Sequence, residues 1–381
     1  MKLGIVEYQG WGKVRELSKA LNILGSRNVM LVVGSTSYVA SGAKPIVDVL
    51  LSPYNVNRFI VSSSLPNIGT IAEGVSIARS SGADVVVGIG GGNVLDTAKC
   101  IAVLSTQLID DYKSLITKKI PLIGKSLPKI LIPTTAGTGS EATQFAVIYM
   151  EKQKYSLDNK IVFPEFAIID PGLTSSLNPY ITACTGIDAL AQAIEAFWSV
   201  RSTDESKRYS SDAITSILPV LYEVVNNPYA KHREVMTCGS NLAGKAINIA
   251  RTTAPHSVSY PISAHFGVQH GHAVALTLPS IFDYNGAVEE DTVQDKRGIS
   301  YVLDTMGELC LMFDTTDCLY VKHKLECLLD LIGLERRLSK LGVTESGVDI
   351  VLNEGFNPER VINNPRVLTR DALEVMLRKI Y

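Results

Sequence analysis

The sequence predicts an α/β N-terminal domain built on a doubly wound parallel sheet, followed by an all-α C-terminal domain. The chain of 381 residues is longer than one hydrophobic core usually serves, so two domains are expected. Short β-branched runs alternate with helical patterns up to Asp170, and strand–helix alternation is typical of a parallel sheet. From Pro179 onward, patterns with a 3.6-residue period dominate. We therefore expect domains at 1–175 and 176–381.

Five strands are predicted in the first domain, each from a continuous apolar run: 28–33, 58–61, 84–89, 129–132 and 166–169. Continuous runs, in contrast to alternating ones, indicate strands that are covered on both faces. Helical patterns lie between them, for example at 12–24 and 68–80. The second domain contains long predicted helices at 183–200, 205–225, 233–249 and 322–341.

Composition excludes several classes of partner. Hydrophobic residues make up 46% and charged residues 19% of the chain, as in ordinary globular enzymes. The formal net charge is −2 and no basic block is present, so neither nucleic acid nor a membrane is an expected partner. The six cysteines form no CxxC pair and indicate mostly buried free thiols. With no signal-peptide core at the N-terminus, the sequence predicts a cytoplasmic protein.

A glycine run follows the third predicted strand. Gly90, Gly91, Gly92 and Asn93 lead directly into a helical pattern, where Asn93 is placed to cap the helix. Such a turn lets a phosphate approach the backbone at a helix N-terminus. The alternative is a tight turn that needs positive φ, with Asp96 and Lys99 as a surface pair on the helix.

A second loop of this kind follows the fourth predicted strand. Its glycines alternate with hydroxyl residues at Thr134, Thr135, Thr138 and Ser140, which suit contacts to phosphate or ribose. Open α/β sheets bind ligands at the carboxyl ends of their strands. A flexible linker is the alternative, although two such loops at consecutive strand ends argue against it.

Metal-ligating residue types are concentrated in the second domain. Asp188, Gln192 and Glu195 project from one helical face. Four of the six histidines fall close together at His256, His265, His270 and His272. Imidazoles with a carboxylate and an amide oxygen suit Fe²⁺ or Zn²⁺. Histidines scattered in a loop are the alternative.

At this point the sequence resembles the iron-containing (group III) alcohol dehydrogenase family over nearly its whole length. The matching stretches are GGGNVLDTAK (90–99), PTTAGTGSEAT (133–143), DPGLTSSLNP (170–179), GIDALAQAIEAF (186–197), HSVSYPISAHFGVQHGHAVALTLP (256–279) and NNPRVLT (363–369). The resemblance implies a dinucleotide-binding α/β domain, a helical domain, a nicotinamide cofactor and usually a homodimer. Asp96 and the two glycine-containing loops would contact the dinucleotide.

The family's metal ligands fall on Asp188, Gln192, His256 and His270. The family normally has histidine at position 192, so the site is either four-ligand or an Asp–His–His set like that of the glycerol dehydrogenases. A metal-free member, like the maleylacetate reductases, is a further alternative. Another family histidine is replaced by Tyr260, whose phenol either donates a proton or packs.

Cofactor preference rests on the residue after the first predicted strand. The family commonly has an aspartate there that repels a 2′-phosphate, whereas this chain has Ser35. NADP(H) is therefore expected to be preferred over NAD(H).

The segment 250–261 is most similar to the phosphonoacetaldehyde reductase branch, as are 197–200 and 154–157, where Lys154 is a further cofactor-binding candidate. Arg251 would hold an anionic substrate, or else pair with a carboxylate. Tyr260, Arg251 and His265 are the catalytic candidates. Another polar alcohol or sugar acid as substrate, and a nucleotide-binding scaffold without turnover, are the alternatives.

Overall fold

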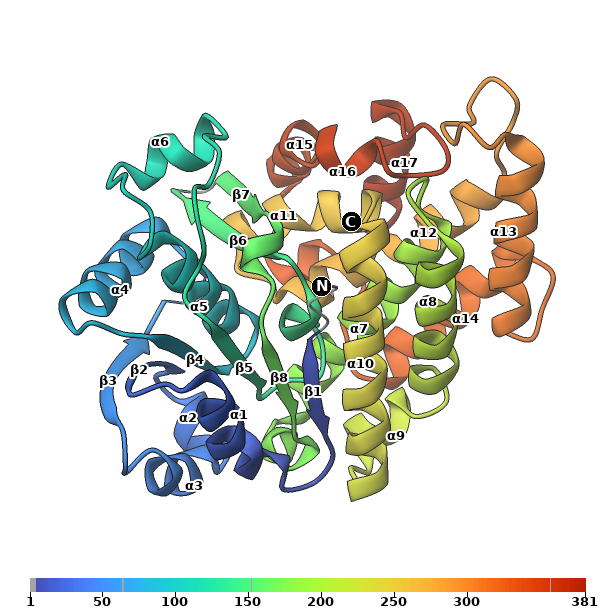
Figure 1. The fold of residues 1–381 in the computed structure, drawn as a ribbon. Coiled ribbons are helices and arrows are strands. Elements are labelled where there is room, and N and C mark those ends of the chain that lie inside the picture. Colours follow the sequence, from blue (N-terminus) through green and yellow to red (C-terminus); the bar gives the residue numbers. More distant parts are fainter. Residues whose placement is uncertain (1–4, 64, 152, 357) are drawn as a thin grey trace. The chain divides into compact units, whose positions relative to one another are not determined.

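The computed structural model describes residues 5–63, 65–151, 153–356 and 358–381 (Figure 1). The chain divides into two compact units, Met1–Leu177 and Asn178–Tyr381.

The first unit is built on a six-stranded, fully parallel sheet with the strand order β1-β8-β5-β4-β2-β3. The chain passes from β2 to its neighbour β3 at one edge of the sheet, and from β4 to β5 and then β8 toward the other edge. The direction in which successive strands are added therefore reverses between β2 and β4. The predicted α/β class is confirmed. The strands are β1 (Val6–Gln9), β2 (Asn28–Gly34), β3 (Asn55–Val61), β4 (Val85–Gly90), β5 (Lys129–Pro133) and β8 (Phe166–Ile169).

Helices cover both faces of this sheet, which explains the continuous apolar runs. Val29 and Leu31 of β2 belong to one core, together with apolar residues of α1 and α3. Met30 and Val32 belong to the opposite core, with residues of α4 and α5. The helices of this unit are α1 (Leu17–Leu24), α2 (Ser37–Ala40), α3 (Ala43–Leu50), α4 (Ile68–Ser80), α5 (Gly92–Leu104) and α6 (Tyr112–Thr117), with 3-10 turns η1 (Lys13–Glu16), η2 (Ser140–Ala142), η3 (Lys160–Val162) and η4 (Pro171–Thr174).

Three strands were not anticipated from the sequence. β1 is a short edge strand that pairs only with β8, and its centre carries polar residues. β6 (Phe145–Met150) and β7 (Gln153–Asp158) form a separate antiparallel pair. β7 is mostly polar and lacks a continuous apolar run, since only Leu157 on it is fully buried. β1 and β7 therefore carry a weaker hydrophobic signal than the central strands, whereas β6 is a continuous apolar run that was not predicted as a strand.

The second unit is helical throughout its described residues, apart from one isolated bridge between Val293 and Arg366. Helices α7, α8 and α10 pack against one another, and α12 packs against both α7 and α11. The helices are α7 (Pro179–Trp198), α8 (Asp204–Ile217), α9 (Leu221–Asn226), α10 (Ala230–Ala250), α11 (Ala254–Phe266), α12 (His270–Gly286), α13 (Ile299–Met312), α14 (Cys318–Leu331), α15 (Glu345–Glu354), α16 (Pro358–Val361) and α17 (Arg370–Lys379), with one 3-10 turn, η5 (Ser339–Leu341).

Two predicted helices are shorter than the apolar pattern indicated. The pattern at 205–225 is divided between α8 and α9, and Pro219 lies in the gap, where its missing N–H interrupts the helix. The pattern at 322–341 ends as a helix at Leu331, followed by Gly333 with φ 75°. Within the described residues, no helix combines the length and hydropathy that a membrane span requires.

Candidate active site

The glycine-containing loops of the first unit meet at one edge of the sheet. β5, β4 and β2 are neighbours and parallel, so the residues that follow them emerge side by side. Gly90–Gly92 end β4 and begin α5, the loop from Thr134 to Ser140 follows β5, and Ser35 follows β2. This edge includes the point between β2 and β4 where the connection direction reverses, which is where open α/β sheets bind ligands.

Gly90 and Gly92 are required here by close packing, and none of the three glycines has positive φ. A Cβ on Gly90 would lie 2.6 Å from Cβ of Val94, and one on Gly92 would lie 2.6 Å from Cγ2 of Thr138. Helix α5 starts at Gly92 with Gly91 as its N-cap and no side-chain cap. The N–H of Val94 already donates to the carbonyl oxygen of Gly91, so the N–H groups of Gly92 and Asn93 are the ones placed to bind a ligand anion.

Asn93 does not cap α5, contrary to the sequence expectation. It lies inside the first turn, and its side-chain amide donates to the carbonyl oxygen of Ser63 at 2.5 Å. The cap position falls two residues earlier because the glycines allow the helix to begin at once. Asn93 thus ties the glycine turn to the segment after β3.

Asp96 and Lys99 are buried and do not form the surface pair considered as an alternative. The Asp96 carboxylate accepts from the Ser140 hydroxyl at 2.6 Å and from the backbone N–H of Val147 at 2.9 Å. The Lys99 ammonium lies 3.7 Å from Asp96 and donates to the Thr143 hydroxyl at 2.9 Å. Asp96 and Ser140 therefore fasten the second loop to α5. Their contact with a dinucleotide stays a prediction.

The remaining predicted cofactor residues differ in exposure. Ser35 is exposed, and its backbone N–H donates to Val61 at 3.2 Å. Thr134 is buried, and its N–H donates to Gly90 at 2.9 Å. Thr135 lies beside Gly91, and Lys154 is half-buried in β7.

In the second unit, three predicted metal ligands are brought together from three helices. Asp188 lies on α7, His256 in the first turn of α11, and His270 at the first residue of α12. One ligand atom from each lies within 4.8 Å of the others. Nε2 of His256 is 3.3 Å from Oδ1 of Asp188, and Nε2 of His270 is 3.9 Å from the same oxygen.

Gly271 is a determinant of this cluster that the sequence reading missed. A Cβ there would lie 1.9 Å from the carbonyl oxygen of Cys184 and 2.8 Å from Cβ of Asp188. Only glycine lets the start of α12 approach α7 so closely. The approach places His270, the preceding residue, beside Asp188. In the sequence, the sign of this role is a glycine directly after the candidate ligand His270.

The polar atoms at the cluster fit a cation. Among the described residues, Oδ1 of Asp188, Oε1 of Gln192 and Nε2 of His256 are buried without a hydrogen-bond partner. Leaving three such atoms unsatisfied is costly, and one bound cation would satisfy them together. The side-chain amide of Gln192 also donates to Oδ2 of Asp188 at 3.2 Å. Two imidazoles, a carboxylate and an amide oxygen are a donor set for Fe²⁺ or Zn²⁺.

His256 is held by a second carboxylate. Its Nδ1 is hydrogen-bonded to Oε1 of Glu195, which is fully buried. Burial lowers the pKa of His256, but Glu195 and Asp188 outweigh burial and raise it to about 10. The pocket thus favours positive charge beside these carboxylates, whether a proton or a metal ion carries it.

Of two other predicted residues, Tyr260 contacts the cluster, and Arg251 lies on the linker before α11. The Tyr260 ring stacks on His270 with centroids 6.0 Å apart and planes 16° apart. Tyr260 is one helical turn after His256, so both lie on the same face of α11. Arg251 is buried and is the C-cap of α10, with φ 65° and ψ 170°.

Arg251 does not lie on a helix that continues to His256. A linker, residues 251–253, separates α10 from α11. His265 is nine residues after His256, which places it on the opposite side of α11, and it contacts Glu354 at 2.8 Å. Nε2–H of His272 donates to the carbonyl oxygen of Glu335 at 2.7 Å, its Nδ1 lies 3.2 Å from the Tyr180 hydroxyl, and burial lowers its pKa. A catalytic role for His265 stays a prediction.

Comparisons with known proteins agree with this arrangement. Residues 7–171 match the iron-containing alcohol dehydrogenase family, and residues 182–381 match the C-terminal domain of the Fe-containing alcohol dehydrogenase family. Long-chain-alcohol dehydrogenase 1 of Geobacillus thermodenitrificans is 32% identical over 385 residues, 99% of this chain and 94% of that protein. Phosphonoacetaldehyde reductase of Streptomyces viridochromogenes is 33% identical over 312 residues, 78% of this chain and 76% of that protein.

A solved structure extends the comparison to three dimensions. The sulfoacetaldehyde reductase from Bifidobacterium kashiwanohense, crystallised with NAD⁺, has 28% sequence identity and a TM-score of 0.87. The match covers 99% of this chain and 96% of that chain. Family, fold and site geometry therefore agree: the chain belongs to the iron-containing alcohol dehydrogenase family and is an oxidoreductase acting on alcohols or aldehydes.

Proposed function

We propose that this enzyme reduces an anionic two-carbon aldehyde to a primary alcohol, namely phosphonoacetaldehyde to 2-hydroxyethylphosphonate. NADPH is the proposed hydride donor, and one Fe²⁺ or Zn²⁺ is the proposed metal. The observation that carries the substrate proposal is the buried Arg251, on the linker that leads directly into the first turn of α11 and His256.

Two similarities support an anionic substrate. The relatives described above include reductases named for phosphonoacetaldehyde and for sulfoacetaldehyde, which are both two-carbon aldehydes with an acidic group. A guanidinium presents a planar fork of N–H donors that matches such oxyanions. Arg251 on the linker is the proposed anion-binding residue.

The residues of the second unit have distinct proposed roles. Asp188, His256 and His270 would hold the metal, with Gln192 either as a weak fourth ligand or as the donor that orients Asp188. When bound, the metal supplies Lewis acidity toward the substrate oxygen. Tyr260, stacked on His270, is the proposed donor of the proton to the aldehyde oxygen, which becomes the alcohol oxygen.

The NADPH preference rests on Ser35. Its side chain is exposed after β2, and a small hydroxyl leaves room for a 2′-phosphate that a carboxylate would repel. The glycine turn before α5 would receive the pyrophosphate.

The proposal is tested by following NADPH and NADH consumption with a panel of aldehydes. Phosphonoacetaldehyde, sulfoacetaldehyde, propanal and a long-chain aldehyde separate the possibilities. The highest kcat/KM is expected for phosphonoacetaldehyde. If a long-chain aldehyde is the best substrate, a second candidate function is favoured, namely the reduction of long-chain aldehydes, which the name of the Geobacillus relative suggests. Turnover of another polar aldehyde alone would remove the phosphonate claim, and no turnover at all would favour a nucleotide-binding scaffold.

The assembly and location remain part of the proposal. A cytoplasmic homodimer is expected, and light scattering of the purified protein at several concentrations would show twice the 41.2 kDa chain mass. A monomer at all concentrations would contradict it.

A further inference from the structure

Glu195 occupies the position where the metal cluster and the Arg251 linker meet. It lies near the end of α7 and is fully buried. Its Oε2 accepts from the backbone N–H of Thr253 at 2.7 Å and from the Thr253 hydroxyl at 2.9 Å. Its Oε1 accepts from Nδ1 of His256. A buried carboxylate is tolerated only when donors of this kind surround it.

The bond to His256 determines which ring nitrogen is available. A carboxylate accepts hydrogen bonds, so Nδ1 carries a proton, and Nε2 is the nitrogen whose lone pair a metal ion would bind in place of a proton. That Nε2 is the atom 3.3 Å from Asp188, buried without a hydrogen-bond partner among the described residues. Carboxylates that orient a ligand histidine in this way typically change metal affinity 10- to 100-fold when removed.

The bonds to Thr253 fix the linker from which Arg251 projects. Arg251 has φ 65° and ψ 170°, a conformation that is essentially confined to glycine and costs about 1–3 kcal/mol. Such a conformation persists only where the surrounding structure determines it. Thr252 accepts from the Asn363 amide at 3.1 Å, and the Thr253 hydroxyl accepts from Nε1 of Trp198 at 2.9 Å. The linker is therefore held at each residue after Arg251.

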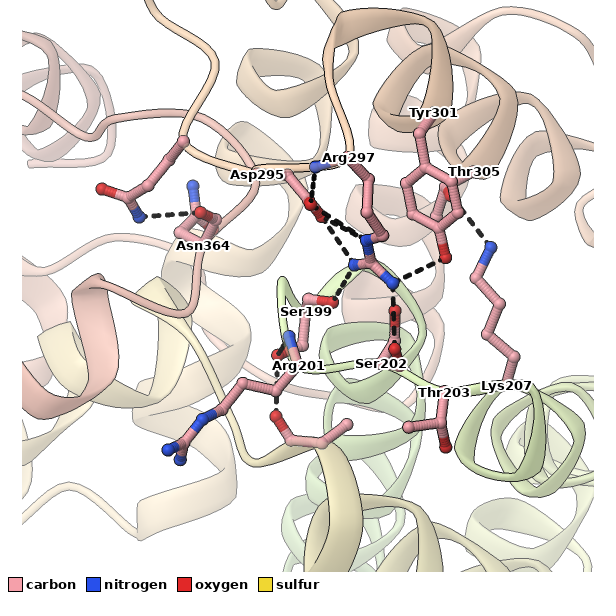
Figure 2. Close-up of polar contacts among 12 residues, drawn as sticks. Ser199, Arg201, Ser202, Thr203, Lys207, Asp295, Arg297, Tyr301, Thr305 and Asn364 are labelled. Carbon is pink, nitrogen blue, oxygen red and sulfur yellow. Dashed lines mark hydrogen bonds and ion pairs between the residues drawn. The ribbon is translucent and has the colours of Figure 1, made fainter.

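The turn that follows α7 supports the same linker from its other end. The Ser199 hydroxyl donates to the carbonyl oxygen of Ala250 at 2.7 Å, immediately before Arg251. Figure 2 shows how this turn is fixed: the Arg297 guanidinium donates to the carbonyl oxygens of Ser199 at 3.0 Å and Ser202 at 2.9 Å. Arg297 is itself paired with Asp295.

We infer that Glu195 is a positioning residue that couples the two halves of the site. Through His256 it sets the ring nitrogen that faces the metal, and through Thr253 it holds the linker that presents Arg251 to the anionic group of the substrate. This inference rests on the proposed function, because it takes the cluster to be a metal site and Arg251 to bind the substrate.

The test uses the full-length enzyme freed of metal with a chelator, in three variants. Glu195→Gln keeps the side-chain shape but removes the charge. Thr253→Val removes one bond to Glu195 and leaves the bond to His256. Trp198→Phe is the matched control, because it removes a donor to the same hydroxyl without touching Glu195. Affinity for Co²⁺ is measured in competition with a chelating indicator, together with the visible absorption of bound Co²⁺.

Glu195→Gln should weaken Co²⁺ binding by about 10- to 100-fold and alter the absorption spectrum. Thr253→Val and Trp198→Phe should bind Co²⁺ as the native enzyme does, while Thr253→Val should raise KM for phosphonoacetaldehyde more than KM for propanal. Native Co²⁺ affinity in Glu195→Gln would overturn the inference. Equal losses of affinity in all three variants would do the same, because Glu195 would then act only as part of the fold.

Two further outcomes are distinguished by design. No Co²⁺ binding by the native chain would overturn the proposed function itself, before any variant is compared. If Glu195→Gln does not fold, Glu195→Asp replaces it. The shorter carboxylate cannot reach Thr253 and His256 together, so the Co²⁺ affinity of Glu195→Asp is expected to fall below that of the native enzyme. Native Co²⁺ affinity in this variant would contradict the coupling.

Discussion

Replacing Arg251 separates its proposed role in substrate binding from its effect on stability. Arg251→Ala removes the guanidinium but keeps Cβ, so the backbone strain at φ 65° and ψ 170° remains. Arg251→Gly removes the guanidinium and the strain together. The two variants lose the same side-chain contacts, and a difference between them therefore reports on the backbone.

The expected changes in stability and in kcat/KM follow from the backbone conformation of Arg251 and from the hydrogen bonds that its guanidinium would make to the substrate. Strain of about 1–3 kcal/mol is relieved in the glycine variant, while glycine costs about 0.5–1 kcal/mol in chain entropy. Arg251→Gly should therefore be more stable than Arg251→Ala by about 1 kcal/mol, within a range of roughly 0–2.5 kcal/mol. Charge-assisted hydrogen bonds contribute about 1.5–3 kcal/mol each, so both variants should lose about one to two orders of magnitude in kcat/KM for phosphonoacetaldehyde.

Two measurements check this prediction. Urea unfolding compares the stabilities, and NADPH consumption compares phosphonoacetaldehyde with propanal, whose turnover should be largely retained. Arg251→Lys should rescue partly, because an ammonium lacks the planar fork. Equal losses for the charged and the neutral aldehyde would make Arg251 a structural residue. An alanine variant more stable than the glycine variant would refute the strain argument.

Three further changes test separate parts of the account. Gln192→His restores the usual family ligand and should tighten metal binding in chelator competition; unchanged affinity would place Gln192 outside direct contact with the metal. Ser35→Asp should penalise NADPH selectively through repulsion of its 2′-phosphate, and a native preference for NADH would contradict the cofactor proposal. Gly271→Ala forces a Cβ against the Cys184 carbonyl. It should lower the free energy of unfolding by about 1–3 kcal/mol and weaken metal binding. Gly307→Ala in α13 is its control, since nothing lies within 4 Å there and about 0.5–1 kcal/mol of stabilisation is expected; equal effects would refute the close-packing argument.

The central sheet could be predicted from the sequence because burial on both faces leaves a strong local signal. The run at β2 is apolar at each position from Val29 to Val33, and the residues divide alternately between two cores. β1 has no such signal, because an edge strand pairs on one side and carries polar residues. Its place depends on pairing with β8, far away in the sequence, which local patterns do not contain.

The candidate site was predictable where it follows helical spacing and not where it depends on helix packing. Asp188 and Gln192 lie one turn apart on α7, and their spacing alone placed them on one face. The positive φ of Arg251 between α10 and α11 could not be foreseen, because residues other than glycine adopt it only where the surrounding structure holds it. The Glu195–Thr253 bonds likewise depend on how α7 packs against that linker.

The central claim is that the cluster on α7, α11 and α12 holds one catalytic metal ion. Elemental analysis of the purified protein, before and after chelation, together with NADPH-dependent turnover in both states, tests it directly. About one Fe²⁺ or Zn²⁺ for each chain is expected, with turnover lost on chelation and restored by the metal. Full turnover in rigorously metal-free protein would contradict the account.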